Sequence, residues 1–238
     1  MHTRMRVFLV LMIAVYCFIP AVFAAEWENE VKEFRGKMYI GGTQLDLDAL
    51  NERLADKGYT EFSDGLFSFG GGAFIRVSER FMLGFDGNFS AGDYVDSVIG
   101  TKSYSSSIFA GTFFVDTAFL AFTSDYCDIF PVVGIGGGGI AVKIGQNEFD
   151  DILDDPKHAA MISTGSMLLK LAVEADYKFK VSGNSEKLKF LTVGFNAGYA
   201  LPIFSGGWYM NEFKLNGSPD GGISGPFVHI TFGGGGGK

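Results

Sequence analysis

The sequence predicts an all-β fold, an antiparallel up-and-down transmembrane β-barrel of about eight strands with one short helix near residues 46–57. Three observations predict it. From residue 66 onward, apolar side chains alternate with small or polar ones, as in strands with two different faces. The connections between these strands alternate between short and long. After residue 24, no apolar run approaches the roughly 18 residues that indicate a membrane-spanning helix.

The first 36 residues differ from the rest of the chain. Arg4 and Arg6 precede an apolar run that ends in Val22-Phe23-Ala24, which is the layout of a secretory signal peptide cleaved after Ala24. We therefore expect a signal peptide over 1–24, a periplasmic segment over 25–36 and the barrel over 37–235. An uncleaved membrane anchor is the alternative for the first segment.

The expected mature chain is acidic and rich in glycine. Removing Arg4 and Arg6 changes the formal net charge from −8 to −10, and such a charge argues against a nucleic-acid partner. Cys127 is then the only cysteine left, so no intramolecular disulfide can form. The 34 glycines and 25 phenylalanines among 238 residues suit an exported β protein better than a helical one.

The first elements are a short strand and a helix. Residues 38–42 are strand-like. In the segment that follows, Leu47, Leu50 and Leu54 recur at helical spacing and Gly58 comes after the end, which predicts a helix of about ten residues near 46–57.

The next strands are expected at 66–77, 81–91 and 103–123. Residues 130–145 form another, in which the apolar positions change from odd numbers (Val133, Ile135) to even numbers (Ile140, Val142) across Gly136–Gly139. A shift of one residue exchanges the two faces of a strand, so we expect a bulge or glycine kink there. After an acidic loop over 146–165, strands follow at 168–181, 189–203 and 225–232.

Strand 168–181, LLKLAVEADYKFKV, has the clearest alternation. Its odd positions are apolar or aromatic, whereas most of its even positions are charged. This pattern suits a barrel wall between lipid and a polar lumen, or a soluble β-domain with one face on a core and one in water. The apolar faces lack charge, and aromatic residues lie near the expected strand ends, so we favour the membrane barrel. The candidates for aromatic girdles are Phe81, Tyr177, Phe179, Tyr199, Trp208 and Tyr209.

Together the signal peptide, the two-residue periodicity, the alternating connections and the last strand FVHITF resemble the small eight-stranded outer-membrane proteins of Gram-negative bacteria. The resemblance covers roughly residues 37–235. It implies location in the bacterial outer membrane, and as partners it implies outer-membrane lipid with lipopolysaccharide and the barrel assembly machinery. Such proteins usually end on an aromatic residue, whereas here Phe232, our candidate assembly signal, is followed by GGGGGK.

Two sets of candidate residues follow from the strand faces. We expect a polar lumen network of Arg76, Asp86, Asp116, Lys170, Glu174, Asp176, Lys178, Asn196 and His229. We expect a lipid-facing set of Phe85, Leu169, Leu171, Val173, Val193, Phe195, Val228, Ile230 and Phe232. In a narrow barrel the lumen charges should pair with one another and fill the interior; in particular, the charges of 168–181 should find partners such as Arg76 and Asp116.

The expected role is structural or surface-interactive rather than catalytic, without a cofactor or catalytic metal. One alternative is a narrow permeation barrel for a small solute, which would leave lumen charges unpaired. A second is a lipid-modifying hydrolase built on His229 and Thr231, which would need a hydroxyl and a carboxylate within reach of the imidazole. The acidic loop 147–158 is expected to be solvated, or to bind a divalent cation that bridges to lipopolysaccharide phosphates.

Overall fold

The computed structural model describes residues 33–146, 159–181, 189–210, 212–219 and 223–237. The predicted signal peptide, most of the predicted periplasmic segment and the acidic loop 147–158 lie outside these residues. Within them, no helix has the length and apolar character needed to cross a membrane.

Eight long antiparallel strands make up the ring, and four short strands extend it. The long strands are β1 (Glu33–Gln44), β2 (Gly65–Arg76), β3 (Phe81–Ala91), β5 (Lys102–Phe119), β7 (Cys127–Gln146), β8 (Ala159–Lys180), β9 (Phe190–Ser205) and β12 (Gly225–Gly236). The short strands are β4 (Val95–Ile99), β6 (Phe122–Thr123), β10 (Tyr209–Met210) and β11 (Phe213–Lys214), and the helix α2 spans Asp48–Ala55. The predicted helix near 46–57 is confirmed.

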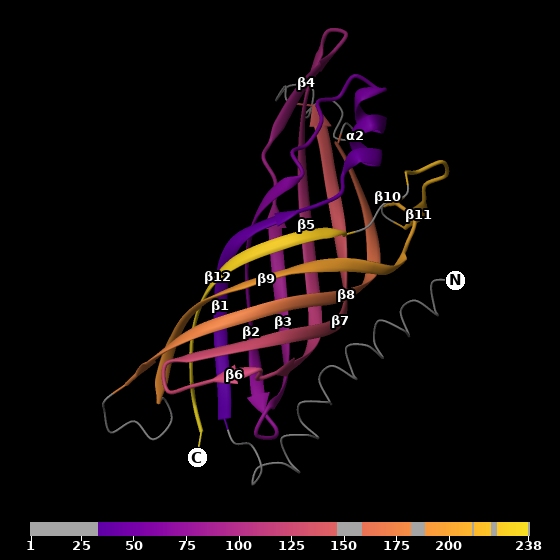
Figure 1. Ribbon diagram of the computed structural model, residues 1–238. Coiled ribbons are helices and arrows are strands. Elements are labelled where there is room, and N and C mark those ends of the chain that lie inside the picture. Colours follow the sequence, from indigo (N-terminus) through magenta and orange to yellow (C-terminus); the bar gives the residue numbers. More distant parts are fainter. Residues whose placement is uncertain (1–32, 147–158, 182–188, 211, 220–222, 238) are drawn as a thin grey trace.

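The sheet closes on itself, which confirms the predicted fold class (Figure 1). Each long strand pairs with its neighbours in the chain, and β1 pairs with β12 to complete the ring. Following the register once around the ring from Arg76 leads back to β2 at Leu66, a stagger of ten residues (76 to 66). Such a stagger requires strands tilted from the barrel axis.

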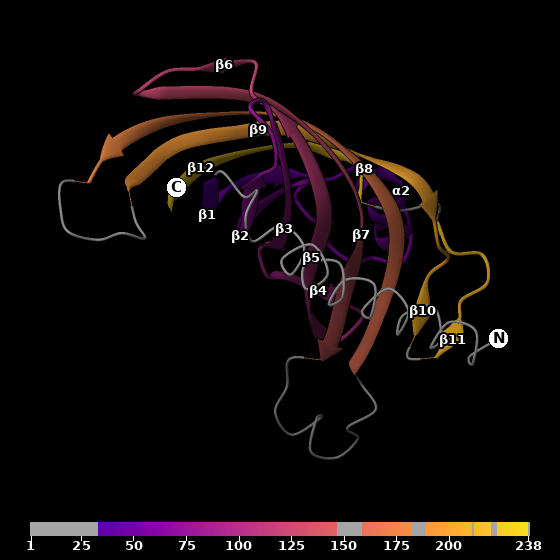
Figure 2. The same cartoon turned by 90° about the horizontal axis from the view of Figure 1, so that it is seen from below.

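The two ends of the barrel differ. At one end, where Phe34 of β1 lies opposite Gly236 of β12, the connections are short. At the other end β5, β7 and β8 extend beyond the ring, and β4 pairs with β5 there to form a hairpin. The helix α2 lies beside this hairpin (Figure 1). Viewed from below, β10 and β11 continue this loop end, far from β6 at the end with short connections (Figure 2).

The outer wall is apolar. Its exposed side chains include Phe81, Phe85 and Phe89 along β3, and Leu171, Val173, Tyr177 and Phe179 along β8. Aromatic rings contact one another across neighbouring strands, for example Phe81 with Phe119 at 5.3 Å and Phe69 with Phe89 at 5.4 Å between ring centroids. Phe81, Tyr177 and Phe179 are exposed near strand ends, as expected for a girdle. Tyr199 is also exposed, but it lies inside β9 opposite Leu171, away from the strand ends. Trp208 is not: it is buried inside the loop end.

The predicted bulge at Gly136–Gly139 is wrong. The register of β7 with both β5 and β8 is continuous through these glycines. The apolar positions change from odd to even because Ile140 and Val142 face inward into an apolar part of the interior. A register shift lies instead between Met167 and Leu168, in the pairing of β8 with β9.

Several strands also begin earlier than predicted. The first begins at Glu33, ahead of the expected barrel start at 37, and β8 begins at Ala159, inside the predicted loop 146–165. The reason is the same in both places: mixed polar and small residues resemble a loop, although their alternation continues the strands. The four additional residues at the start of β1 include Arg35, whose side chain forms an ion pair with Asp128 inside the barrel.

An apolar cap closes the loop end of the interior. Leu50 and Leu54 of α2 pack with Leu45, Phe62 and Trp208 onto inward side chains of the wall. Those wall residues are Leu66, Ile108, Ala110, Phe114, Ile140, Val142, Leu168 and Ala200. The helix is thus a part of the core that fills the barrel mouth, rather than a loose external segment.

Candidate functional site

Inward side chains form three ionic tiers between the end with short connections and the apolar cap. In the first tier Asp128 and Asp176 lie side by side in the register of β7 and β8. Arg35 Nη2 lies 2.5 Å from Asp128 Oδ2, and Lys178 Nζ lies 2.9 Å from Asp128 Oδ1. Arg35 Nη1 also lies 3.8 Å from Asp176, and Arg35 Nε contacts Glu33, so two cations face three carboxylates.

The second tier is a single ion pair with an amide. Lys37 of β1 contacts Glu174 of β8, and Asn196 Nδ2 donates a hydrogen bond of 3.2 Å to the same carboxylate. The ammonium of Lys37 also lies 4.8 Å from the ring centroid of Phe74, a distance at which cation–π attraction contributes.

The third tier places one lysine between two carboxylates. Lys170 of β8 is only 2 % exposed. Its Nζ contacts Asp86 of β3 and lies 2.6 Å from Asp116 Oδ2 of β5. The ring centroid of Phe114 lies 5.0 Å from the ammonium. The three charged residues come from three strands, and together they span the interior.

His229 belongs to a separate, neutral contact. Its Nε2 lies 2.8 Å from Ser68 Oγ, and its ring stacks between Tyr39 and Phe227 at centroid distances of 4.6 and 5.2 Å. Ser68 is 0 % exposed. A hydroxyl is therefore within reach of the imidazole, but it is enclosed by the barrel wall, and Thr231 donates to Asp176 at 3.3 Å instead.

The structure thus brings eight of the nine predicted lumen residues into the interior, and Arg76 differs from the expectation. Its guanidinium lies at the rim, 3.4 Å from Glu33, and it donates to the carbonyl oxygens of Ser78 and Glu79. The carboxylates of 168–181 pair with Arg35 and Lys37 instead. Residue 76 is the last of β2, which explains why its long side chain turns to the open end.

Sequence reasoning missed four interior partners, namely Arg35, Lys37, Asp128 and Ser68. The signal was present in EFRGKMYIGG, where Arg35, Lys37 and Tyr39 alternate with Phe34, Met38 and Ile40. Interpreting this stretch as a short strand after a charged lead segment concealed the alternation. Asp128 resembles a turn residue in the sequence, although it faces inward from the start of β7.

The predicted lipid-facing residues all lie on the outer wall. Phe85, Leu171, Val173, Val193, Phe195, Val228, Ile230 and Phe232 are exposed, and Leu169 is half-buried. Phe232 is followed by Gly233–Gly236, which continue β12 in register with β1.

Inward glycines act as spacers between bonded side chains. Asp116, Gly134 and Lys170 lie in register on three consecutive strands, and the ion pair crosses over the glycine. The same arrangement recurs where Ser68 contacts His229 across Gly41 and where Thr231 contacts Asp176 across Gly194. In a narrow barrel, large inward side chains need small ones beside them, which accounts for much of the glycine content.

Gly134 offers a test of this spacing. A Cβ at this position would lie 2.1 Å from Asp116 Oδ1 and 3.2 Å from Lys170 Cε, so Gly134→Ala should disrupt the ion pair. We expect a loss of about 1–3 kcal/mol in the free energy of unfolding, measured by guanidinium titration of the protein in lipid vesicles. The matched control is Gly137→Ala on the same strand, where the nearest atom is 3.5 Å away. Equal effects of the two substitutions would refute the spacer role.

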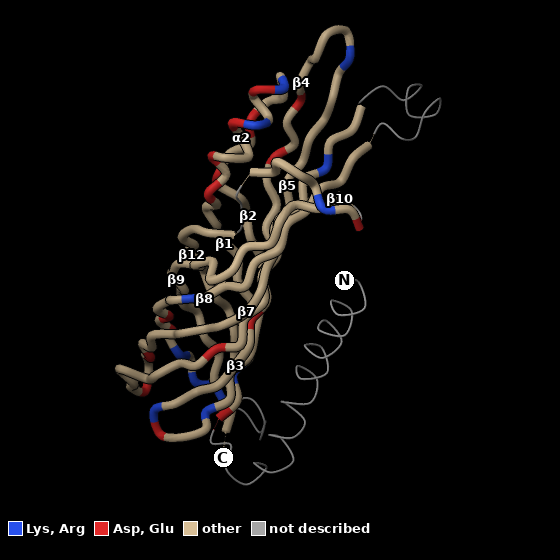
Figure 3. Tube along the Cα trace, turned by 90° about the vertical axis from the view of Figure 1, so that its right-hand side faces the viewer, with Lys and Arg blue, Asp and Glu red and all other residues tan. Residues whose placement is uncertain are grey.

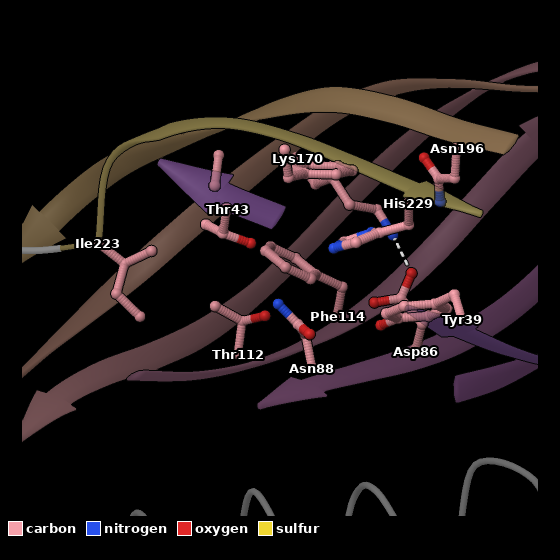
Figure 4. A pocket seen from close by; sticks show the side chains of 12 residues that line it. Tyr39, Thr43, Asp86, Asn88, Thr112, Phe114, Lys170, Asn196, Ile223 and His229 are labelled. Carbon is pink, nitrogen blue, oxygen red and sulfur yellow. Dashed lines mark hydrogen bonds and ion pairs between the residues drawn. The ribbon is translucent and has the colours of Figure 1, made fainter. Parts of the chain in front are cut away.

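A cavity of about 30 Å³ lies at the level of the third tier (Figure 4). Its lining includes Asp86, Asn88, Lys170, Asn196 and His229, with Thr43 and Phe227 on the side of the cap. This waist cavity has room for about one water molecule. It is bounded by the ionic tiers on one side and by the apolar cap on the other.

No protein-family model and no curated protein sequence matches the chain. Among solved structures, the attachment invasion locus protein Ail of Yersinia pestis aligns with a TM-score of 0.44 and 9 % identity, over 86 % of this chain and 97 % of Ail. The strand pairing gives the chain the architecture of a small, closed antiparallel β-barrel.

Two further structures give the same likeness of fold. Neisserial surface protein A aligns with a TM-score of 0.34 and 10 % identity, over 85 % of this chain and 94 % of that protein. The outer membrane protease OmpT from Escherichia coli aligns with a TM-score of 0.30 and 10 % identity, over 86 % and 93 % of the two chains. At these values the likeness concerns the fold alone.

Proposed function

We propose that the protein is an integral barrel of the bacterial outer membrane with a closed interior and a structural or surface-interaction role. The observation that carries this proposal is the combination of an apolar outer wall with a filled lumen. Exposed aromatic and aliphatic side chains surround the ring, and such a wall is stable against lipid rather than water. Eight strands leave an interior that side chains can fill.

The filled lumen favours this role over permeation. The lumen charges pair within their tiers, and the waist cavity between the tiers and the cap has room for only about one water molecule. A solute path would require the apolar cap to leave the barrel mouth and the ion pairs to separate. Both changes are costly, because they would expose apolar surface and leave buried charges unpaired.

A hydrolase is also disfavoured by the site. Ser68 and His229 form a hydroxyl–imidazole pair, but both are enclosed by the barrel wall, and the described contacts of the imidazole ring faces are aromatic. A lipid substrate would have to reach Ser68 through the sheet.

The loop end is the part that is available to external partners. The β4 hairpin projects furthest from the ring, and α2 lies beside it (Figure 3). Asp48 and Glu52 of α2 are exposed, as is Asp56, which follows the helix. An open hollow of about 820 Å³ along α2 is lined by the same carboxylates together with Glu61 and Asp64. Lipopolysaccharide, other envelope proteins and host surfaces are the partners that this end would meet, and the assembly machinery would read Phe232.

An epitope insertion tests the proposed orientation. Gly100 is at the tip of the β4–β5 hairpin, with φ of +65°, and a Cβ added to it would have nothing within 4 Å, so an inserted epitope should leave the barrel intact. We expect antibody to bind intact cells that carry this insertion. The matched control is the same epitope between Ser78 and Glu79 in the β2–β3 turn, which should be detected only after permeabilisation. The reverse pattern, or no surface detection of either epitope, would contradict the proposal.

A further inference from the structure

The outer wall is taller on one side of the barrel. Strands β7 and β8 are 20 and 22 residues long, whereas β1, β2 and β12 have 12 residues each. In Figure 1, β7 and β8 rise beyond the ring, and β10 and β11 continue the sheet beside β8. The outward positions of β8 carry no charge from Met161 to Phe179. A tilted strand needs only about 9–11 residues to cross a bilayer, so this face reaches beyond the hydrocarbon core into the headgroup layer.

Glycines expose the backbone near the upper end of this face. Gly111 of β5, Gly139 of β7 and Gly165 of β8 form one row in register. They are at outward positions, because they alternate with inward residues of the apolar cap and its neighbours. In the next row toward the membrane, Phe113 and Met167 have long side chains. Glycine inside a strand allows another molecule to approach the sheet closely.

Two lysines lie on the same face, just beyond the glycine row. Lys143 of β7 is exposed at an outward position. Lys214 of β11 is in register with Tyr209 of β10, which is in register with the outward Ser163 of β8. Residues paired in this way share a face of the sheet. A Cβ added to Gly207 would lie 2.6 Å from Lys214 Cε, so the lysine side chain lies along the β10–β11 hairpin.

These lysines are exceptional in the wall. Every other lysine or arginine of the described strands is at an inward position or at a strand end. Within the described ranges, no carboxylate forms an ion pair with Lys143 or Lys214. Positive charge on the otherwise uncharged outer face is thus confined to the loop end, where it complements an anionic lipid headgroup.

We propose that this face, formed by β7, β8, β10 and β11, binds a lipopolysaccharide-type glycolipid, which has phosphates on its sugar headgroup and several acyl chains. The inference rests on the proposed orientation, in which the loop end is external. Lys143 and Lys214 contact the phosphates, and the hydroxyls of Ser163 and Tyr209 lie between them to meet the sugar. An acyl chain lies over the glycine row.

The spacing of the lysines selects this lipid over a phospholipid. Strands β7 and β11 are separated by β8 and β10, and three strand spacings place the two lysine backbones at least ~14 Å apart. A phospholipid headgroup with one phosphate contacts one of the lysines. A disaccharide headgroup with a phosphate at each end reaches both, and its hydroxyls face the polar residues between them.

Native mass spectrometry of the folded mature chain in detergent tests the proposal, with bisphosphorylated lipid A as the probe. Heat-modifiable gel migration first verifies that each variant is folded. We expect the double variant Lys143→Gln, Lys214→Gln to bind lipid A roughly 30-fold more weakly, about fivefold for each lysine. The matched control is Lys102→Gln, Lys180→Gln, which removes two exposed lysines at strand ends and should retain the affinity.

A second pair of variants tests the acyl-chain contact. Gly165→Leu adds a side chain to the glycine row at a position where a Cβ would be 3.6 Å from the nearest atom, and it should weaken lipid A binding. Gly36→Leu is the control, because Gly36 is an outward glycine at the other end of the barrel with 3.8 Å to the nearest atom. It should bind lipid A as the unaltered protein does.

Three results would overturn the proposal. The first is equal affinity of the unaltered protein and the double lysine variant. The second is equal loss in Gly165→Leu and Gly36→Leu. The third is phosphatidylglycerol binding as tightly as lipid A, because the site would then accept any anionic lipid. Binding in detergent is independent of orientation in the cell, so a failed epitope experiment would contradict the proposed function without changing these results.

Discussion

Replacing Lys170 with methionine should destabilise the barrel by about 3–5 kcal/mol, because it leaves Asp86 and Asp116 buried without their shared cation. The methionine side chain is similar in volume to that of lysine. The loss of stability therefore reports the removed charge rather than a change in packing. The free energy of unfolding can be measured by guanidinium titration in lipid vesicles, with the fluorescence of buried Trp208 as the signal.

Two controls sharpen this experiment. Lys180→Met removes a lysine from the same strand whose side chain is 64 % exposed and pairs with an Asp125 side chain that is 74 % exposed, and it should cost about 0–1 kcal/mol. The triple variant Lys170→Met, Asp86→Asn, Asp116→Asn should recover much of the loss, because no buried charge remains unpaired. A Lys170→Met protein as stable as the Lys180→Met protein would show that the third tier does not stabilise the barrel.

Periodicity was sufficient to predict the wall but not the content of the interior. The alternation in 168–181 correctly separated Leu171 and Val173 from Lys170 and Glu174, because a strand fixes the direction of each side chain. Pairing could not be predicted, because it depends on which strands face each other across the barrel. Lys37 of β1 meets Glu174 of β8 only after β1 has paired with β12 to close the ring, and no local pattern in the sequence records that closure.

The apolar cap escaped prediction for a related reason. The periodicity of Leu50 and Leu54 predicts a helix and its apolar face, but not the surface that this face covers. Likewise, the predicted bulge assumed that the interior is polar along its whole length. Under that assumption the apolar side chains of Ile140 and Val142 had to face lipid, which requires a bulge in the strand. The structure shows that ion pairs share the interior with an apolar cluster near the end with short connections, whereas apolar side chains dominate toward the loop end. This change produces the same switch in the sequence pattern as a bulge would.

An arginine on the outer wall should have a cost that depends on its depth. Leu171 lies on β8 in register with Val133 and Tyr199, in the middle of the apolar belt. Leu171→Arg should therefore destabilise the barrel by about 2–4 kcal/mol, the range for a cation at the bilayer midplane. Met161 is an exposed, outward residue of the same strand, ten positions closer to the loop end. There the same substitution should cost only about 0–1 kcal/mol, as it does near the membrane interface.

The difference between these two variants tests the central claim, that a lipid-facing wall encloses a filled ionic interior. The measurement is the free energy of unfolding of Leu171→Arg and Met161→Arg in lipid vesicles, each relative to the unaltered protein. We expect Leu171→Arg to be the less stable variant by about 2 kcal/mol or more. If the outer wall faced water, arginine would be tolerated equally at both positions, and equal stabilities would contradict the membrane barrel.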